Sequence, residues 1–237
     1  MPTQSTLLWA FLINGLLAAI TMLLGVASFT CALWGTLAGV CIYYGFGYGG
    51  MVILAAFIAV AHAATRYRYS EKTHRASVPA GGRRTGRQAV ASLAIPAVCG
   101  LLAFQFRSLP VTLAYLCAIA AALADTLSGE LGQVFCSKPR MIGSLRAVAP
   151  GTDGAVSLQG LVDGAAGAAF IALLAIPAMG LPWRLVWIVV FAGILGDLAD
   201  SAIGAKLPSR VPLGSEAANL LSTAIGAILG GVLCAAV

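Results

Sequence analysis

The first uncharged stretch constrains the fold most strongly, because residues 7–47 contain no Asp, Glu, Lys or Arg. Other apolar runs follow it, and only 9% of the 237 residues are charged, against about 25% in soluble domains. A helix crosses a hydrocarbon core about 30 Å thick with roughly 20 apolar residues, so these runs predict an integral membrane protein. The runs are long and rich in Leu, Ala, Val and Gly, which favours helices over the alternating strands of a barrel.

The sequence therefore predicts an all-α, polytopic integral membrane helical bundle, a single transmembrane domain over residues 1–237 with about eight transmembrane helices. We expect helices at residues 7 to about 25, 28–47, 49–65, 88–106, 109–126, 156–179, 185–205 and 216 to the end. The first uncharged run is too long for one straight crossing, so it is divided near residues 25–28. A single bent element over that run is the alternative.

The basic residues gather in three of the predicted loops. Residues 66–87, 127–155 and 206–215 hold twelve of the fourteen Lys and Arg residues. Positively charged loops usually face the cytoplasm, so we expect these loops on the cytoplasmic side of a bacterial inner membrane, with both termini on the other side. This bias also accounts for the net charge of +6 without a nucleic-acid partner. Each of the eight acidic residues lies on or near the same side: Glu71, Asp125, Glu130, Asp153, Asp163, Asp197, Asp200 and Glu216.

Two segments that end apolar runs share one acidic pattern. Residues 124–129 and 199–204 both read Ala-Asp-(Thr/Ser)-x-x-Gly, and Asp197 lies one helical turn before Asp200 on the same face. Ionisable groups at membrane depth are costly and usually mark function. We therefore interpret Asp125 and Asp200 as two walls of one site. The alternative is that these acids pair with loop cations and only fix the ends of helices.

Carboxylates near cations and glycine-rich loops are typical of a site for a divalent cation and phosphate. Mg²⁺ is commonly held by one or two carboxylates together with substrate phosphates, a role that fits Asp125 and Asp200. Lys138 and Arg140 are candidates to clamp the phosphates while the metal bridges them.

Two glycine-containing segments are further candidates for phosphate binding. The corner at residues 81–84 puts flexible backbone beside Arg83 and Arg84. The run Pro-Gly-Thr-Asp-Gly at residues 150–154 exposes backbone N–H groups, although such a string is also an ordinary turn. The rest of the basic loop at residues 66–87 is interpreted as a positively charged loop on anionic lipid.

Two Gly-x-x-x-Gly spacings, Gly160 with Gly164 and Gly226 with Gly230, indicate close helix packing. We assign these glycines no chemistry.

Several motifs, in order, resemble those of a membrane family long known as a domain of unknown function. They are Ala124-Asp125-Thr126 with Glu130-Leu131-Gly132, Lys138-Pro139-Arg140-Met141-Ile142, Pro150-Gly151-Thr152-Asp153-Gly154 with Val156-Ser157, and Gly193-x-x-Gly196 with Asp200-Ser201 and Gly204-Ala205. Arg84, Gln88 and the segment Asn219-Leu220-Leu221-Ser222 also look like the family's pattern. The family includes the animal transmembrane protein 19 group and the phytyl phosphate kinases of plants and cyanobacteria. The resemblance covers nearly the whole chain.

The resemblance implies a nucleotide-dependent kinase, using CTP or another nucleoside triphosphate, that converts an isoprenoid monophosphate of phytyl or geranylgeranyl type to its diphosphate at the cytoplasmic membrane face. It also implies site residues. The catalytic candidates are Asp125, Glu130 and Asp200, and the Mg²⁺ candidates are Asp125, Glu130, Asp197 and Asp200. The substrate and phosphate-binding candidates are Arg84, Gln88, Lys138, Arg140, Gly151, Thr152, Asp153, Gly154, Ser201 and Asn219.

The sequence departs from the family pattern at four positions. Ala155 stands where a second Gly is usual, Asp197 where Ser is common, and Ser92 and Glu216 where Asn is common. The extra acids would strengthen metal binding or indicate another substrate. A transporter or flippase of a phosphorylated lipid or another anion is the competing function. Transporters usually place their site near the midplane between inverted repeats, whereas these acids gather on one side.

Overall fold

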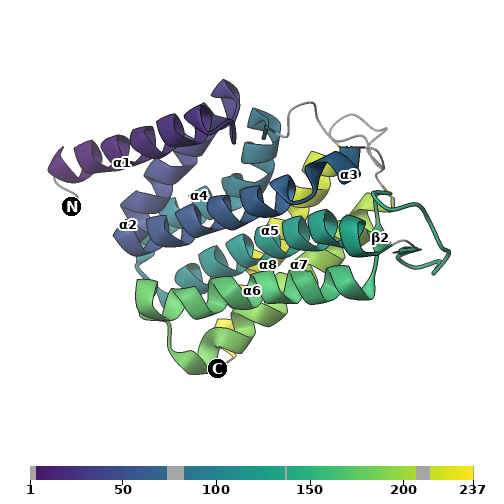
Figure 1. The fold of residues 1–237 in the computed structure, drawn as a ribbon. Helices are drawn as coiled ribbons and strands as arrows, with labels where there is room; N and C mark the ends of the chain where they lie inside the picture. The colour runs from purple at the N-terminus through teal and green to yellow at the C-terminus, as the bar shows by residue number, and fades with distance from the viewer. Residues whose placement is uncertain (1–3, 74–82, 137, 207–213, 237) are drawn as a thin grey trace.

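The structure is a computed structural model that describes residues 4–73, 83–136, 138–206 and 214–236, a bundle of helices with one short hairpin (Figure 1). The elements are α1 (Gln4–Leu23), α2 (Phe29–Arg66), α3 (Tyr69–Thr73), α4 (Gly86–Phe106), α5 (Leu109–Phe135), β1 (Arg140–Met141), β2 (Ala155–Val156), α6 (Leu158–Met179), the 3₁₀ turn η2 (Trp183–Leu185), α7 (Val186–Gly204) and α8 (Gly214–Ala235). Within the described ranges, six helical segments are long and apolar enough to cross a membrane. The all-α integral membrane class is confirmed, and the count of eight crossings stays a prediction.

The second and third predicted helices form one element, α2, which breaks at Gly47. Its 38 residues would span about 57 Å if straight, well beyond a hydrocarbon core of about 30 Å. Gly47 has φ 61° and ψ −147°, a conformation that only glycine adopts without strain. The break turns the second half of α2 away from the first (Figure 1).

Helix α5 is the centre of the bundle, because it packs against α2, α4, α6, α7 and α8. Residues 115–121 are all fully buried. The prediction that this helix ends near Thr126 is wrong, since α5 continues to Phe135. Nothing between these two positions breaks a helix, and Gly132 lies in close contact with α6, where a Cβ would be 3.4 Å from the Cα of Gly160.

The packing interpretation of the paired glycines is confirmed. A Cβ on Gly160 would lie 2.9 Å from the carbonyl oxygen of Ser128 on α5. One on Gly226 would lie 2.9 Å from the carbonyl oxygen of Cys117, also on α5. Helices α6 and α8 therefore approach the backbone of α5 from different sides, which brings their first turns close to the end of α5.

Replacing Gly164 tests this packing, because the glycine contacts both α5 and α7. A Cβ there would lie 2.7 Å from Asp197 Oδ2 and 3.2 Å from the carbonyl oxygen of Ala124. We expect Gly164→Ala to lower the melting temperature of the purified protein, because the carboxylate and the backbone of α5 must both shift. Gly129→Ala is the control, since nothing lies within 4 Å of its Cβ position, and Ala is favoured over Gly in a helix by roughly 1 kcal/mol. An equal effect of the two substitutions on melting would contradict this packing.

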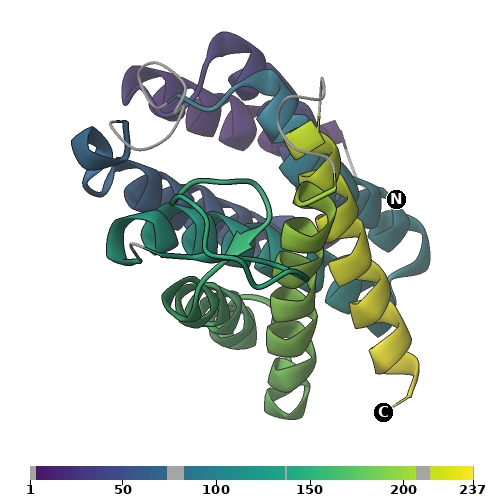
Figure 2. The same ribbon diagram turned by 90° about the vertical axis from the view of Figure 1, so that its right-hand side faces the viewer.

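A short hairpin covers one end of the bundle. Strands β1 and β2 are antiparallel, with Arg140 opposite Val156 and Met141 opposite Ala155. Figure 2 looks onto this end and shows the segment between α5 and α6 crossing in front of the helices. The turn at residues 150–154 is held beside the end of α7, where a Cβ on Gly154 would lie 2.6 Å from the backbone nitrogen of Ala205.

Candidate functional site

Six helix ends meet at this end of the bundle. The last turns of α2, α5 and α7 and the first turns of α4, α6 and α8 all contribute residues to two adjoining pockets. The pockets share Asp125, Gly129 and Gln133, which lie on the last three turns of α5. The C-terminal end of α5, carrying the first acidic motif, therefore separates two cavities.

The first cavity, here called the acidic pocket, has a volume of about 180 Å³. Its carboxylates are those of Asp125 on α5, Asp153 in the turn, and Asp197 and Asp200 on α7. Ser201 and the whole of residues 150–154 also line it. The two Ala-Asp-(Thr/Ser)-x-x-Gly motifs, one on α5 and one on α7, thus line the same pocket.

The three helical carboxylates differ in their partners. Asp197 is buried, with 3% of its surface exposed, and its Oδ1 accepts a hydrogen bond from Ser128 Oγ at 2.7 Å. Asp200 Oδ1 is buried and has no hydrogen-bond partner among the described residues. The carboxyl groups of Asp200 and Asp125 line the same pocket, so their like charges oppose each other. An arrangement of this kind is costly unless a cation or a proton joins it.

The turn at residues 150–154 forms the outer wall of the acidic pocket. Gly151 and Gly154 have φ values of 82° and 75°, which favour glycine. Thr152 donates a hydrogen bond from Oγ1 to the carbonyl oxygen of Ala149 at 2.7 Å, so this side chain closes the turn on itself. The run is therefore an ordinary turn that lies beside the acids, and phosphate binding by it stays a prediction.

The second cavity, here called the basic pocket, has a volume of about 230 Å³. Arg83, Arg84, Gln88 and Asn219 line it opposite the acids of α5. Three predicted site residues outside the acidic motifs, Arg84, Gln88 and Asn219, therefore lie together with the neighbouring Arg83 on the other side of Asp125. A pocket with two guanidinium groups and two amides suits a phosphate group.

Backbone contacts fix the position of Arg84. Its N–H donates to the carbonyl oxygen of Val26 at 3.0 Å, and its own carbonyl oxygen accepts from the N–H of Ser28 at 3.0 Å. Two residues later α4 begins with a capping box, in which the backbone N–H of Thr85 donates to Gln88 Oε1 at 2.9 Å. The Gln88 oxygen is thus used by the helix cap, while the residue also lines the basic pocket.

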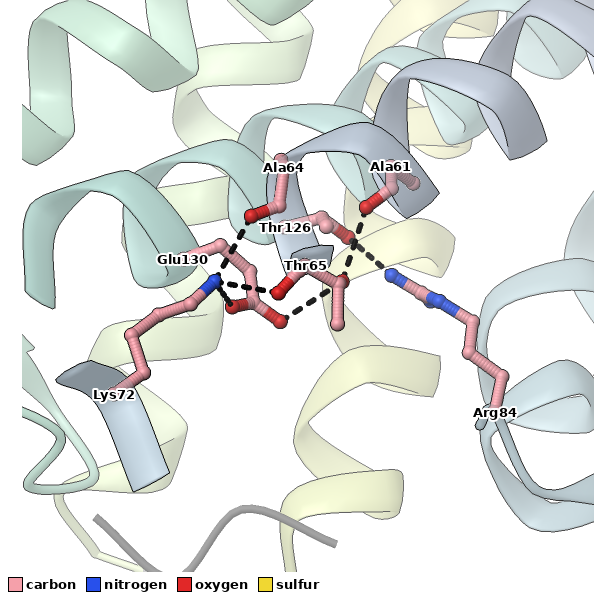
Figure 3. A network of polar contacts seen from close by, with 7 residues as sticks. All are labelled: Ala61, Ala64, Thr65, Lys72, Arg84, Thr126 and Glu130. Atoms are coloured by element: carbon pink, nitrogen blue, oxygen red, sulfur yellow. Dashed lines mark hydrogen bonds and ion pairs between the residues drawn. The ribbon is translucent and has the colours of Figure 1, made fainter. Parts of the chain in front are cut away.

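The guanidinium group of Arg84 points toward α5, where its Nη2 lies 3.4 Å from Thr126 Oγ1 (Figure 3). Burial lowers the pKa of Arg84 below its ordinary value, while the charges of Glu130 and Asp125 act in the opposite direction. Arginine nevertheless stays protonated in proteins. Arg84 therefore holds a positive charge between two acids of α5.

Glu130 is held by a different set of contacts from the other acids. Lys72 Nζ donates to Glu130 Oε2 at 2.6 Å, and Thr65 Oγ1 donates to Glu130 Oε1 at 3.0 Å (Figure 3). The same ammonium group donates to the carbonyl oxygens of Ala64 and Thr65 at 2.9 and 2.8 Å. Glu130 lines the basic pocket, but both of its oxygens are already bonded to other residues. As a predicted metal ligand it lies apart from the acidic pocket.

Lys72 is the residue that sequence reasoning missed. It was grouped with the positively charged loop, yet its side chain is 1% exposed and all three of its donors are used. Its partner is 58 residues away in the chain. No short-range pattern in the sequence indicates such a contact.

Two predicted phosphate ligands lie outside both pockets. Arg140 is exposed and donates from Nη1 to the carbonyl oxygen of Leu145 at 2.8 Å, within its own hairpin. Lys138 is exposed, and the pocket linings contain its neighbour Pro139 instead. Of the glycine corner at residues 81–84, the first two residues lie outside the described residues.

The acidic pocket fits a divalent cation by its chemistry. It offers carboxylate oxygens from two helices, one of them buried without a hydrogen-bond partner within the described ranges. No group of three or more His, Cys, Asp or Glu side chains forms a ready-made metal centre in the part of the chain that the structure describes. Mg²⁺ does not require one, because it is usually held by one or two carboxylates, substrate phosphates and waters.

Comparison with known families gives a match over most of the chain. The model of a family described as integral membrane protein DUF92 matches residues 12–229. The match contains every predicted site residue, from Arg84 to Asn219.

Individual relatives agree with the family match. An uncharacterized membrane protein of Methanocaldococcus jannaschii is 36% identical over 148 residues, or 62% of this chain and 61% of that protein. An uncharacterized membrane protein of Synechocystis is 29% identical over 81% of this chain and 76% of its own length. Protein VTE6, chloroplastic, of Arabidopsis thaliana is 24% identical over 81% of this chain and 61% of its own length. Two of these three relatives are therefore matched over less than two thirds of their length. No solved structure matches the chain.

Proposed function

The chain belongs to the integral membrane protein DUF92 family, and from this and the paired pockets we propose that it is a membrane-embedded phosphotransferase. It converts an isoprenoid monophosphate of phytyl or geranylgeranyl type to the diphosphate, using CTP or another nucleoside triphosphate. The observation that carries the proposal is the pair of adjoining pockets that share Asp125, one lined by carboxylates without a cation among the described residues and the other by two guanidinium groups beside two acids. Two substrates that both bear phosphate would meet at that residue.

We assign the nucleoside triphosphate to the acidic pocket and the lipid monophosphate to the basic pocket. Asp125 and Asp200 would hold Mg²⁺, with Asp197 adding negative charge beside them, and the ion would supply charge neutralisation and orientation to the triphosphate. The backbone of residues 150–154 and Ser201 would contact the nucleotide. Arg83, Arg84, Gln88 and Asn219 would bind and orient the lipid phosphate.

The transfer itself requires little chemistry from side chains. An oxygen of the lipid monophosphate forms a bond to the γ-phosphorus, and the bond from that phosphorus to the β,γ-bridging oxygen breaks. The nucleoside diphosphate leaves with the electron pair. The second pKa of a phosphate monoester is about 6, so the attacking oxygen is ionised at neutral pH and needs no general base. Positioning and electrostatics are then the main contributions of the protein.

Glu130 has a positioning role in this proposal. Its contacts with Lys72 and Thr65 tie the end of α2 to α5, beside the basic pocket. Glu130 also lies close enough to Arg84 to favour the charged guanidinium. Glu130 would therefore help to position Arg84 in the basic pocket and would not contact the nucleotide.

The experiment that tests the proposal is transfer of labelled γ-phosphate by the purified protein. CTP, ATP, GTP and UTP are each supplied with Mg²⁺ and with phytyl, geranylgeranyl or farnesyl monophosphate, and the lipid product is separated. We expect a labelled diphosphate from at least one pair. No labelled lipid from any pair, with folded protein that moves the same lipids across vesicle membranes, would contradict the kinase and support the transporter.

A further inference from the structure

A third cavity adjoins the basic pocket and has a different character. It is an apolar pocket between α1, both halves of α2 and the first turns of α4. Arg84 and Gln88 line both this cavity and the basic pocket. The basic pocket therefore continues directly into the apolar pocket.

The apolar pocket runs along the helices, away from Arg84. On α1 its lining extends from Thr21, whose carbonyl oxygen accepts from the N–H of Val26 beside Arg84, back to Asn14. Those seven residues of helix correspond to about 10 Å. On α2 the lining includes Gly35 before the break and Phe57 after it. The break at Gly47 thus lets two halves of one helix form walls of the same cavity.

The pocket is small, with a volume of about 70 Å³ against about 180 Å³ for the acidic pocket. A cavity of this volume accepts part of one hydrocarbon chain more readily than parts of the two chains of a glycerolipid. Its mouth carries a guanidinium group that is positioned by backbone contacts and complements a phosphate. Asn14 lies at the end of the α1 lining farthest from Thr21, is 2% exposed and donates from Nδ2 to the carbonyl oxygen of Ala10 at 2.8 Å.

We propose that this apolar pocket binds the first part of the hydrocarbon chain of a single-chain lipid monophosphate, whose phosphate lies at Arg84 and Gln88. The proposal rests on the proposed function for the identity of the headgroup. Beyond the proposed function, it states the position of the hydrocarbon chain and gives a reason for a preference for one chain over two. The polar headgroup stays with the guanidinium and amide groups, while the chain leaves water for an apolar wall, as amphipathic ligands generally bind.

Gly35 offers a direct test, because nothing lies within 4 Å of its Cβ position and it lines the pocket. Gly35→Leu therefore fills the cavity without a backbone clash. Gly15→Leu is the matched control, since this helical glycine of α1 is exposed, also has open space at Cβ, and lies outside the pocket lining. Both changes replace Gly by a better helix former.

We expect Gly35→Leu to raise the KM for geranylgeranyl monophosphate about tenfold or more, because the leucine displaces several buried methylene groups of the chain. The KM for isopentenyl monophosphate, whose chain is a quarter as long and is expected to stay near Arg84, and the KM for the nucleotide are expected to stay unchanged. Gly15→Leu is expected to behave as the wild type. Equal effects of Gly35→Leu on the long and the short substrate would overturn the proposal.

A binding measurement separates this proposal from the proposed function. Tritiated geranylgeranyl monophosphate is bound to the wild type and both variants without nucleotide, with geranylgeraniol and phosphatidic acid as competitors. We expect weaker binding only in Gly35→Leu, and little competition from either competitor. If neither the wild type nor a variant transfers phosphate, but Gly35→Leu still loses binding, the chain-binding pocket is supported and the proposed kinase activity is contradicted. Equal binding by all three proteins, or full competition by phosphatidic acid, would overturn the pocket.

Discussion

Asp125→Asn is expected to lower kcat for lipid diphosphate formation by about 100-fold or more, the size typical of losing a charge that positions a metal and a transferring phosphate. Asp125 is the only carboxylate that lines both the acidic and the basic pocket within the described ranges. Its amide replacement keeps the shape but removes the charge that faces both substrates. The measurement is kcat at saturating nucleotide, lipid and Mg²⁺.

Asp163→Asn is the control for this experiment. Asp163 is also an acid near the end of a helix, but it lies outside both pockets and its Oδ1 accepts from Gln159 Nε2 at 3.0 Å. We expect nearly wild-type turnover from this variant. Similar kcat values for Asp125→Asn and Asp163→Asn would show that the acid shared by the pockets has no part in transfer.

The second large effect is expected on stability. Lys72→Met removes the buried partner of an ion pair and leaves Glu130 Oε2 and two carbonyl oxygens without this donor, while Glu130 Oε1 keeps its bond from Thr65. Breaking a fully buried pair costs about 3–5 kcal/mol of the free energy of unfolding, and the 25% exposure of the Glu130 side chain lowers the expected loss to about 2–3 kcal/mol. The measurement is reversible unfolding of the purified protein in detergent. Lys206→Met, at an exposed lysine, is the control and is expected to change little.

A double variant separates the ion pair from general damage to the loop. Adding Glu130→Gln to Lys72→Met removes the charge that was left unpaired, so we expect part of the lost stability to return. If the double variant is less stable than Lys72→Met by the full cost of Glu130→Gln alone, the two side chains do not act together, and the positioning role of Glu130 is wrong.

The class and much of the helix layout could be predicted from hydropathy alone. Long uncharged runs form helices when they cross a membrane, because each backbone polar group must be bonded within the segment. The division of the first run near residues 25–28 matches the gap between α1 and α2. The break at Gly47 was predicted as a loop between two helices. Sequence does not distinguish a loop from a kink at such a glycine, because the same residue permits both.

The acidic half of the site was predictable because local sequence carries its signal. The repeated Ala-Asp-(Thr/Ser)-x-x-Gly pattern identifies Asp125 and Asp200, and the structure brings both into one pocket. The division into two cavities was not predictable, since it depends on α5 continuing beyond Thr126. Sequence motifs also group Lys138 and Arg140 with the site, whereas Arg140 bonds within the hairpin and neither residue lines either pocket.

Two departures from the family pattern now have a place in the structure. Asp197, where Ser is common, adds a buried carboxylate to the acidic pocket and receives a hydrogen bond from Ser128. Ser92, where Asn is common, lines the apolar pocket. The first change adds to the charge available for a cation. The second removes an amide from the proposed path of the hydrocarbon chain, so a difference in lipid preference between relatives would be expected at this position.

The most direct test of the two-pocket account compares Ser201→Ala with Asn219→Ala. Ser201 lines only the acidic pocket of the two, and Asn219 only the basic one. A hydrogen bond to a charged group is worth about 1.5–3 kcal/mol, or roughly a 10- to 100-fold change in affinity. We therefore predict that Ser201→Ala raises the KM for the nucleotide alone, and that Asn219→Ala raises the KM for the lipid monophosphate alone. If both variants raise the KM for the same substrate, the assignment of one substrate to each pocket is contradicted.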